Sequence, residues 1–251
     1  MTKILAISSQ VVFGPVGLNA IVPALQAEGH DVLTLPTVTL SNHPGHGKPA
    51  GTAHDLGPII IALENIKAFD NIDAVITGYF SSAEQVHIAA SLIKKLNPKI
   101  ILIDPVLGDH GKLYVPPAVA EAIRDYLIPL ATIAMPNAFE LSWLTKESVE
   151  NESQATVAAP QLNVSEVIVT SVPAGDDLAT LRITPSGVTV IKNKKRDSVP
   201  NGTGDMLSGL YLARQFGDVR ESALADSMAI LQNAIALSGE TKILAIAKAL
   251  H

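Results

Sequence analysis

Short apolar runs alternate with longer amphipathic segments along most of this chain. Six runs have about the length of a buried strand: Ile4–Ile7, Val32–Leu35, Ala74–Thr77, Ile100–Ile103, Thr132–Met135 and Val167–Thr170. Two later segments repeat apolar residues on one helical face: Val86, Ala89, Ala90, Ile93 and Leu96, then Val119, Ile123, Tyr126 and Leu127. Strands that alternate with helices predict right-handed crossovers and a doubly wound, mostly parallel sheet.

The pattern changes in the last third of the chain. Leu181–Thr184 and Val188–Ile191 flank the turn signal Pro185-Ser186-Gly187, which predicts a late antiparallel hairpin. After Gly204 helical spacing returns in three segments: Leu207–Phe216, Glu221–Leu237 and Lys242–Leu250. We therefore expect an α/β fold, a three-layer α/β/α sandwich with a mostly parallel central sheet and a late antiparallel hairpin.

The longest stretch without a period runs from Pro36 to Gly57 and is rich in Gly, Pro and His. An irregular loop of this length is usually functional or disordered. Open α/β sheets bind ligands beyond the carboxyl ends of their strands. Four segments are thus expected to line one cleft: Ser8–Gly17, Pro36–Gly57, Gly78–Ser82 and Asp104–Tyr114. The turn at Asn201–Asp205 must join them if it is catalytic.

Composition narrows the picture further. A chain of 251 residues is near the limit of one hydrophobic core, so we expect a single domain over residues 1–251. With 47% hydrophobic but only 4% aromatic residues, that core consists mainly of Ala, Val, Ile and Leu, which suits a sheet covered on both faces.

Charge and cysteine content exclude several classes of protein. The formal charge of −6 argues against a nucleic-acid partner, and the absence of Cys excludes disulfides, thiolate metal sites and a cysteine nucleophile. No apolar run reaches the roughly 18 residues of a membrane span, and the N-terminal run is too short for a signal peptide. We expect a cytoplasmic protein without a membrane partner.

Gly202-Thr203-Gly204-Asp205 is the segment with the clearest chemistry. Its glycines allow a tight turn that presents successive backbone N–H groups, and the helix that follows adds its positive N-terminal end. Such a nest stabilises transferring phosphoryl charge, and Asp205 is placed to accept a hydroxyl proton. The same residues also make an ordinary helix N-terminus. The turn alone does not decide between these interpretations.

The order of segments resembles the ribokinase-like superfamily and, within it, the pyridoxal (vitamin B6) kinases. The stretches that carry the resemblance span nearly the whole chain: Ile4 to Gly17, Ser41-Asn42-His43, Thr77-Gly78-Tyr79, Asp104-Pro105-Val106-Leu107-Gly108-Asp109, Pro136-Asn137-Ala138-Phe139-Glu140 and Gly202-Thr203-Gly204-Asp205. The resemblance implies a ribokinase-like fold and a small-molecule kinase with Asp205 as its base and Gly202, Thr203 and Gly204 around the phosphoryl group.

Roles for other residues follow from the same resemblance. It implies substrate binding by Ser9, Val16, His43 and Tyr79, with the Tyr79 ring against the flat pyridine ring. It implies nucleotide binding by Asp104, Thr170, Ser171 and Thr203. Asp104 and Glu140 are implied to hold Mg²⁺ with ATP, largely through water. From the residues alone, Asn137 and Glu140 also fit a capping box, and both roles are compatible.

Three further features bear on the expected site. Asp109 and Tyr114 lie in a segment that covers the ligands in the family, and Gly108 and Gly111 give it the freedom of a lid. His43 and His46 fit contact with substrate or lid better than a metal site. The basic run Lys192 to Arg196 reads as a solvated strand end, with contact to ATP as the minority interpretation.

The sequence departs from the family at three positions. Pro44 stands where a threonine often follows Ser-Asn-His, Gln10 where a histidine often follows the first serine, and Met135 where a threonine often precedes Pro136. Only Pro44 touches the expected substrate pocket, so it bears on the choice of vitamer more than on kinase activity.

The resemblance implies phosphorylation of the 5′-hydroxymethyl group of pyridoxal by ATP, with pyridoxine and pyridoxamine as further candidate substrates. It also implies a homodimer and allows a monovalent cation, K⁺ or Na⁺. Two alternatives stay open: a hydroxymethylpyrimidine kinase, and a non-catalytic module that binds B6 vitamers. The absence of a pocket cysteine disfavours the first, while the intact Gly202–Asp205 turn disfavours the second.

Overall fold

The structure of the protein, a computed structural model, describes residues 2–217 and 220–250. The chain falls into two compact units. The first contains the residues up to Tyr79 together with those from Ser198 onward, and the second is Phe80–Asp197. The single-domain organisation expected from chain length stays a prediction.

The first unit is built on a four-stranded arrangement in the order β4-β1-β2-β3. Its strands are β1 (Lys3–Phe13), β2 (Asp31–Asn42), β3 (Gly51–Ala53) and β4 (Ala74–Thr77). β1 pairs in parallel with β2 and β4, and β3 runs antiparallel to β2. Ile4 to Ile7 of β1 are completely buried, so this strand forms the centre of the first core.

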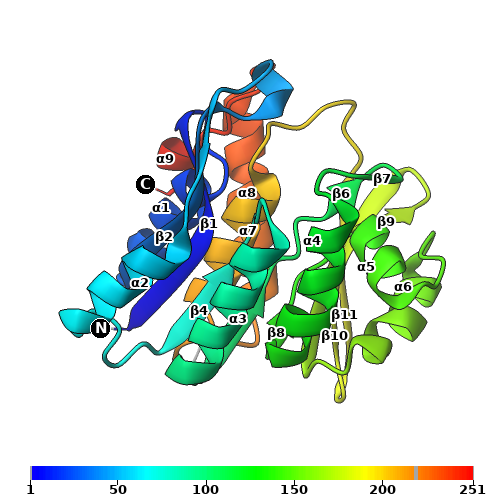
Figure 1. The fold of residues 1–251 in the computed structure, drawn as a ribbon. Coiled ribbons are helices and arrows are strands. Elements are labelled where there is room, and N and C mark those ends of the chain that lie inside the picture. The colour runs from blue at the N-terminus through cyan, green and yellow to red at the C-terminus, as the bar shows by residue number, and fades with distance from the viewer. Residues whose placement is uncertain (1, 218–219, 251) are drawn as a thin grey trace. The chain divides into compact units, whose positions relative to one another are not determined.

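Helices from the N-terminal and the C-terminal parts of the chain complete the first unit. They are α1 (Leu18–Ala27), α2 (Leu56–Asn65), α7 (Thr203–Ala213), α8 (Ala223–Ser238) and α9 (Ile246–Ala249), with a 3₁₀ turn at Pro44–His46. α1 contacts β1, β2 and α7, and α7 contacts α8 (Figure 1). α1, near the start of the chain, thereby fixes α7, whose first residues carry the glycine turn.

Three predictions for this unit need correction. β1 continues to Phe13 and β2 to Asn42, so Ser8–Phe13 and Pro36–Asn42 are strand rather than loop. The chain then returns as β3, so the predicted irregular stretch from Pro36 to Gly57 is largely a hairpin. The polar residues that end each apolar run on β1 and β2 do not interrupt backbone pairing. Of the helix predicted at Lys242–Leu250, only Ile246–Ala249 forms.

The second unit combines parallel strands with an antiparallel hairpin. The strands are β5 (Ile100–Ile103), β6 (Gly108–Asp109), β7 (Lys112–Leu113), β8 (Ile133–Ala134), β9 (Glu166–Ala174), β10 (Asp177–Thr184) and β11 (Gly187–Lys194). β5, β8 and β9 are parallel neighbours, and β9, β10 and β11 are antiparallel. The short strands β6 and β7 form a separate ribbon. The predicted parallel strands and the late hairpin are both confirmed.

The helices of the second unit follow their predicted faces with one exception. They are α3 (Ala83–Leu96), α4 (Pro117–Ala122), α5 (Ala138–Thr145) and α6 (Glu152–Ala158), with α4 continuing through a wider π-turn at Ile123–Leu127 and 3₁₀ turns at Ile128–Leu130 and Ala159–Leu162. Val86, Ala89, Ala90 and Ile93 are buried as predicted. Tyr126 is exposed instead, and its ring packs edge-on against His87.

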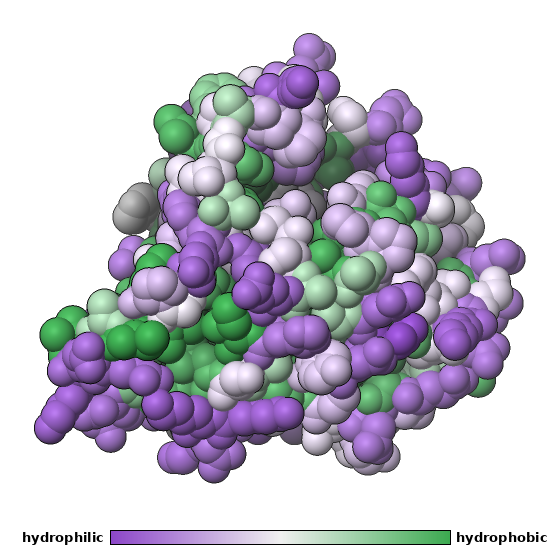
Figure 2. Space-filling model, in the orientation of Figure 1, coloured by the Kyte–Doolittle hydropathy of each residue, from purple (hydrophilic) through white to green (hydrophobic). Residues whose placement is uncertain are grey.

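The surface of the described residues carries some exposed apolar side chains. Ile59, Ile61 and Ile66 on and after α2 are exposed, and Figure 2 shows hydrophobic surface at the left of the view, on the side where α2 lies. Within residues 2–217 and 220–250, none of the helices is both long and apolar enough to cross a membrane.

A buried ion pair in the second unit gives a test of the fold. Arg182 on β10 donates to Glu166 on β9 at 3.0 Å, and Glu166 is almost fully buried. Glu166→Ala leaves a guanidinium without its carboxylate, so we expect the free energy of unfolding in urea to fall by about 3 kcal/mol. The surface pair of Lys194 and Asp177 supplies the control. Lys194→Ala should change the free energy of unfolding by less than about 0.5 kcal/mol. Equal losses in the two variants would contradict this assignment.

Candidate active site

The glycine turn of the first unit forms the start of α7. Gly202 precedes the helix with a φ of 91°, a left-handed conformation that favours glycine. A Cβ atom at this position would lie 1.9 Å from the carbonyl oxygen of Pro15, so no other residue fits without a backbone shift. The turn is thus seated on the loop that links β1 to α1. Its N–H groups at the helix N-terminus face no intrahelical acceptor and are suited to bind an anion.

Asp205 lies in the first turn of α7, and its carboxylate accepts the backbone N–H of Gly17. Gly17 itself has a φ of 56°, and a Cβ atom there would lie 2.3 Å from the carbonyl oxygen of Ser9. Burial raises the pKa of the Asp205 carboxyl above the ordinary aspartate value, while the Gly17 N–H acts in the opposite direction. A desolvated carboxylate with one strong donor is a suitable proton acceptor.

Two of the predicted substrate residues lie beside Gly17 and Gly202. The Ser9 hydroxyl is within 2.4 Å of the position that a Gly17 Cβ atom would take, and a Val16 methyl group is 3.3 Å from the corresponding position at Gly202. Both side chains are buried. The first unit therefore brings Ser9 close to Gly17 and Val16 close to the glycine turn, while their role in substrate binding stays a prediction.

Tyr79 reaches the same region from the end of β4. Between β4 and Tyr79 stands Gly78, where a Cβ atom would lie 3.9 Å from Asp205 Oδ1. The Tyr79 side chain is half-buried, and this burial raises the pKa of its hydroxyl group. The residue before Tyr79 therefore lies close to Asp205, and the partly exposed Tyr79 ring offers a face on which a flat ring can stack.

His43 and Pro44 begin the 3₁₀ turn that follows β2. The Gly45 N–H donates to His43 Nδ1 at 3.0 Å, and Pro44 occupies the first position of the turn, where proline needs no N–H. Burial first, and the neighbouring His46 second, lower the pKa of His43. A Cβ atom on Gly45 would lie 2.7 Å from Asn201 Nδ2, so this turn sits directly on the residue before the glycine turn.

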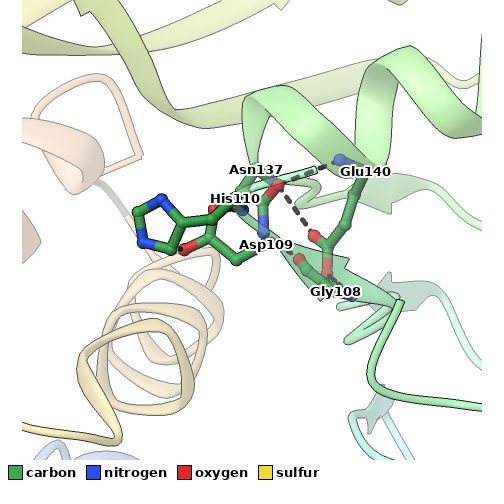
Figure 3. A network of polar contacts seen from close by, with 5 residues as sticks. All are labelled: Gly108, Asp109, His110, Asn137 and Glu140. Carbon is green, nitrogen blue, oxygen red and sulfur yellow. Dashed lines mark hydrogen bonds and ion pairs between the residues drawn. The ribbon is translucent and has the colours of Figure 1, made fainter. Parts of the chain in front are cut away.

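The second unit holds the other predicted residues, organised around Glu140. The side chain of Asn137 accepts the Glu140 N–H, and Glu140 accepts the Asn137 N–H, which confirms the predicted capping box. Glu140 Oε1 also accepts the N–H groups of Leu107 and Gly108, at 2.8 and 3.4 Å. Figure 3 shows Asn137 and Glu140 lying against Gly108, whose carbonyl oxygen accepts Asn137 Nδ2–H.

Burial dominates the electrostatics of Glu140. It raises the pKa of this carboxyl to about 7, against the opposing effect of three backbone donors and with a smaller contribution from Asp109. Among the residues that the structure describes, Oε2 accepts a hydrogen bond from the Asn137 N–H alone and so retains a lone pair. A cation or its bound water near that oxygen would favour the charged carboxylate. The donor chemistry therefore fits Mg²⁺ held through water.

Asp104 directly follows β5, and Thr170 lies in the middle of β9, which continues past the predicted strand end at Thr170 to Ala174; β8 lies between the two strands. Asp104 is almost fully buried, and the chain then turns through Val106, which has a φ of 47°. The Thr170 N–H donates to the Pro136 carbonyl oxygen at 3.0 Å, which places Thr170 beside Asn137. Ser171 also has a positive φ, of 56°, and is exposed. The second unit thus groups Thr170 and Ser171 with the Asn137–Glu140 corner.

Two lysines near the end of β11 are held in ion pairs. Lys192 pairs with Glu152 at 2.6 Å and Lys194 with Asp177 at 2.9 Å, which agrees with a solvated strand end. In the described part of the chain, no group of three or more His, Asp or Glu side chains could hold a metal ion by itself.

Gly17 is the site residue that sequence reasoning missed. It belongs to the quoted opening segment, but its N–H was not expected to reach Asp205. The only available signal was a glycine immediately before the helical spacing that begins at Leu18. A donor on one segment and an acceptor 188 positions away cannot be paired from spacing alone.

Comparison with known proteins decides the family. The family model described as phosphomethylpyrimidine kinase matches residues 24–245. The pyridoxine/pyridoxal/pyridoxamine kinase of Bordetella avium is 34% identical over 250 residues, which cover 93% of this chain and 84% of that relative. The chain belongs to the pyridoxal kinase family.

Solved pyridoxal kinase structures share the whole fold. The pyridoxal kinase of Entamoeba histolytica matches with a TM-score of 0.94 and 28% identity, covering all of this chain and 94% of that one. The pyridoxal kinase of Leishmania donovani in complex with ADP and pyridoxamine matches with a TM-score of 0.88 and 28% identity, covering 99% and 94%. The predicted ribokinase-like α/β fold is confirmed.

Gly17 offers a direct test of this pyridoxal kinase site. Gly17→Ala introduces a Cβ atom 2.3 Å from Ser9 and strains a positive φ, so we expect the Gly17 N–H to move away from Asp205. Turnover should fall by about 100-fold or more, since misplacement of a catalytic group by 1 Å has this effect. Steady-state kinetics with purified protein measures it.

The control for this variant is Gly29→Ala. Gly29 also has a positive φ, of 81°, but nothing lies within 4 Å of its added Cβ atom. It should lower stability by about 1 kcal/mol and leave turnover unchanged. If Gly17→Ala keeps the same turnover as Gly29→Ala, the Gly17–Asp205 contact does not position the base.

Proposed function

We propose that this chain transfers the γ-phosphoryl group of ATP to the 5′-hydroxymethyl oxygen of pyridoxal, with pyridoxine and pyridoxamine as further substrates. The observation that carries this proposal is the placement of Asp205, a desolvated carboxylate at the glycine turn that opens α7. Two comparisons support the same reaction. The chain belongs to the pyridoxal kinase family, and the Leishmania donovani relative was solved in complex with ADP and pyridoxamine.

In this reaction Asp205 accepts the proton of the substrate hydroxyl. The hydroxyl oxygen forms a bond to the γ-phosphorus, while the bond from that phosphorus to the bridging oxygen breaks and ADP leaves with the electron pair. The N–H groups of the Gly202–Gly204 turn bind the oxygens of the transferred group and stabilise their charge. The raised pKa of Asp205 makes its carboxylate a stronger base than an exposed aspartate.

Substrate placement falls to side chains of the first unit. Ser9 supplies a hydroxyl to the pyridine ring, Val16 an apolar contact and His43 a further polar contact. The half-buried ring of Tyr79 stacks on the substrate ring. These roles are supported by the positions of Ser9 beside Gly17 and Val16 beside Gly202, by Gly78 next to Asp205, and by the His43 turn against Asn201.

Nucleotide placement falls mainly to the second unit. The family resemblance assigns Asp104, Thr170, Ser171 and Thr203 to the phosphates of ATP. Asp104 and Glu140 would hold Mg²⁺ through water, and the ion would supply positive charge to the β- and γ-phosphates. A lone pair left on Glu140 Oε2 supports this part of the proposal. A monovalent cation, a homodimer and a cytoplasmic location remain proposals from the family resemblance.

The family model leaves one alternative substrate worth testing. Its description names phosphomethylpyrimidine kinases, and hydroxymethylpyrimidine is also a flat ring with a hydroxymethyl group. One coupled assay of ADP formation with pyridoxal, pyridoxine, pyridoxamine and hydroxymethylpyrimidine decides between the two. We expect the highest kcat/KM for a B6 vitamer. A higher value for hydroxymethylpyrimidine would contradict the proposed substrate.

Asp205→Asn tests the proposed base. The amide keeps the size of the side chain but cannot accept the proton, so we expect kcat to fall by at least about 100-fold while the Kd for pyridoxal changes by less than about 2-fold. Asp226→Asn is the matched control, since Asp226 stands in the first turn of α8 and is exposed. It should keep full activity.

Two results would count against the proposal. Turnover retained by Asp205→Asn would remove Asp205 from the role of base. A wild-type chain that binds pyridoxal yet forms no ADP would instead favour the non-catalytic module.

A further inference from the structure

Two buried hydroxyl groups hold the backbone of Tyr79. The Tyr79 N–H donates to Ser8 Oγ at 3.2 Å, and Thr37 Oγ1 donates to the Tyr79 carbonyl oxygen at 2.7 Å. Ser8 lies on β1 and Thr37 on β2, and neither side chain is exposed to solvent. Both polar groups of one residue are therefore bonded by side chains from two different strands, and we call this pair of bonds the Tyr79 clamp.

The clamp coincides with an irregularity in the pairing of β1 and β2. Ser8 pairs with Pro36, but Gln10 pairs with Thr39, so two residues of β2, Thr37 and Val38, stand opposite the single residue Ser9. Bulges of this kind redirect side chains and recur beside active sites. Thr37 lies within the bulge, and its hydroxyl donates to the Tyr79 carbonyl oxygen.

Ser8 also borders the proposed base. A Cβ atom added to Gly78 would lie 2.4 Å from Ser8 Oγ and 3.9 Å from Asp205 Oδ1. The position that a side chain at residue 78 would take thus lies next to both the Ser8 hydroxyl and the Asp205 carboxylate, and glycine leaves it open. A shift of Ser8 or of the Tyr79 backbone therefore also moves Gly78 relative to the Asp205 carboxylate.

We propose that Ser8 and Thr37 are positioning residues that set where the Tyr79 ring stands relative to Asp205, and hence where the pyridine ring of a B6 vitamer binds. This inference rests on the proposed function. Neither hydroxyl needs to touch the substrate, because both act through the Tyr79 backbone. Because the N–H and carbonyl groups of Tyr79 are fixed, its ring can move only by rotation about the side-chain torsions. A substrate ring that stacks on it is therefore held at a defined position.

Thr37→Val is the principal test, since it removes the hydroxyl and keeps the shape of the side chain. One buried hydrogen bond is lost, so we expect the Kd and KM for pyridoxal to rise by about 5- to 10-fold, with the KM for ATP within about 2-fold of wild type. Thr37→Ser restores a hydroxyl group and should return both values toward wild type. Ser8→Ala removes the other half of the clamp and serves if Thr37→Val does not fold.

A double-mutant cycle with Tyr79→Ala distinguishes positioning from a general structural effect. If Thr37 acts through the Tyr79 ring, Thr37→Val has no further effect on the Kd for pyridoxal once the ring is absent. The coupling then equals the whole 5- to 10-fold effect of the single variant. A general structural effect would persist unchanged in the Tyr79→Ala background and would overturn the proposal.

Thr132→Val is the matched control from the second unit. Thr132 Oγ1 donates to the Ile101 carbonyl oxygen at 3.1 Å and accepts the Ile101 N–H at 2.9 Å, so it too joins two segments through a backbone group. This variant should lower the thermal unfolding midpoint without changing the Kd for pyridoxal. An equal rise in Kd for Thr132→Val and Thr37→Val would overturn the positioning role.

The readouts separate failure of this inference from failure of the proposed function. The Kd for pyridoxal is measured by calorimetry without ATP, so the clamp is tested even in a chain that forms no ADP. If the wild-type chain forms ADP but the effects of Thr37→Val and Tyr79→Ala on the Kd for pyridoxal are additive, the positioning role of the clamp is overturned and the proposed kinase activity stands. Coupled Kd values without ADP formation support the clamp and overturn the kinase, while the absence of pyridoxal binding overturns both.

Discussion

The hydrogen bond from the Gly17 N–H to the Asp205 carboxylate is the interaction on which the first unit's site depends. It joins the loop after β1 to the start of α7, two segments that are far apart in the chain. The close approach is possible because glycine stands at 17, 78 and 202, where a Cβ atom would collide with Ser9, Ser8 or Pro15. The Cβ position at Gly78 also lies 3.9 Å from Asp205 Oδ1, so the missing side chain leaves space beside the carboxylate.

In the second unit, Glu140 is the carboxylate that joins separate segments through backbone N–H groups. Its buried carboxylate accepts three backbone N–H groups, so it holds the turn after β5 and the start of α5 at one point. Val106 adopts a positive φ in this turn, which for a β-branched residue costs about 1 to 3 kcal/mol. The two N–H bonds that follow it offset that strain. A side chain suited to hold water on Mg²⁺ thus also shapes the loop that carries Asp104.

Local signals sufficed for much of the fold. Strand β4, the β10–β11 hairpin and the Asn137–Glu140 capping box were predicted because apolar runs, turn residues and caps act over a few neighbouring positions. The extensions of β1 and β2 were missed because Ser8 and Thr37 are polar yet buried, so the apolar runs end before the strands do. Their partners are long-range: Tyr79 lies 71 positions from Ser8 and 42 from Thr37. Sequence spacing predicts which residues carry the chemistry, but not which buried hydroxyls hold them.

The claim that Asp205 is a desolvated base is tested most directly by its own titration. Carbon-13 NMR of the carboxyl group in the ligand-free protein, with Asp205→Asn used to assign the signal, gives its pKa. Because burial disfavours the charged form, the midpoint should lie above the ordinary aspartate value of 3.8, and activity that needs the carboxylate should fall as pH drops through it. A midpoint at or below 3.8 would contradict the account.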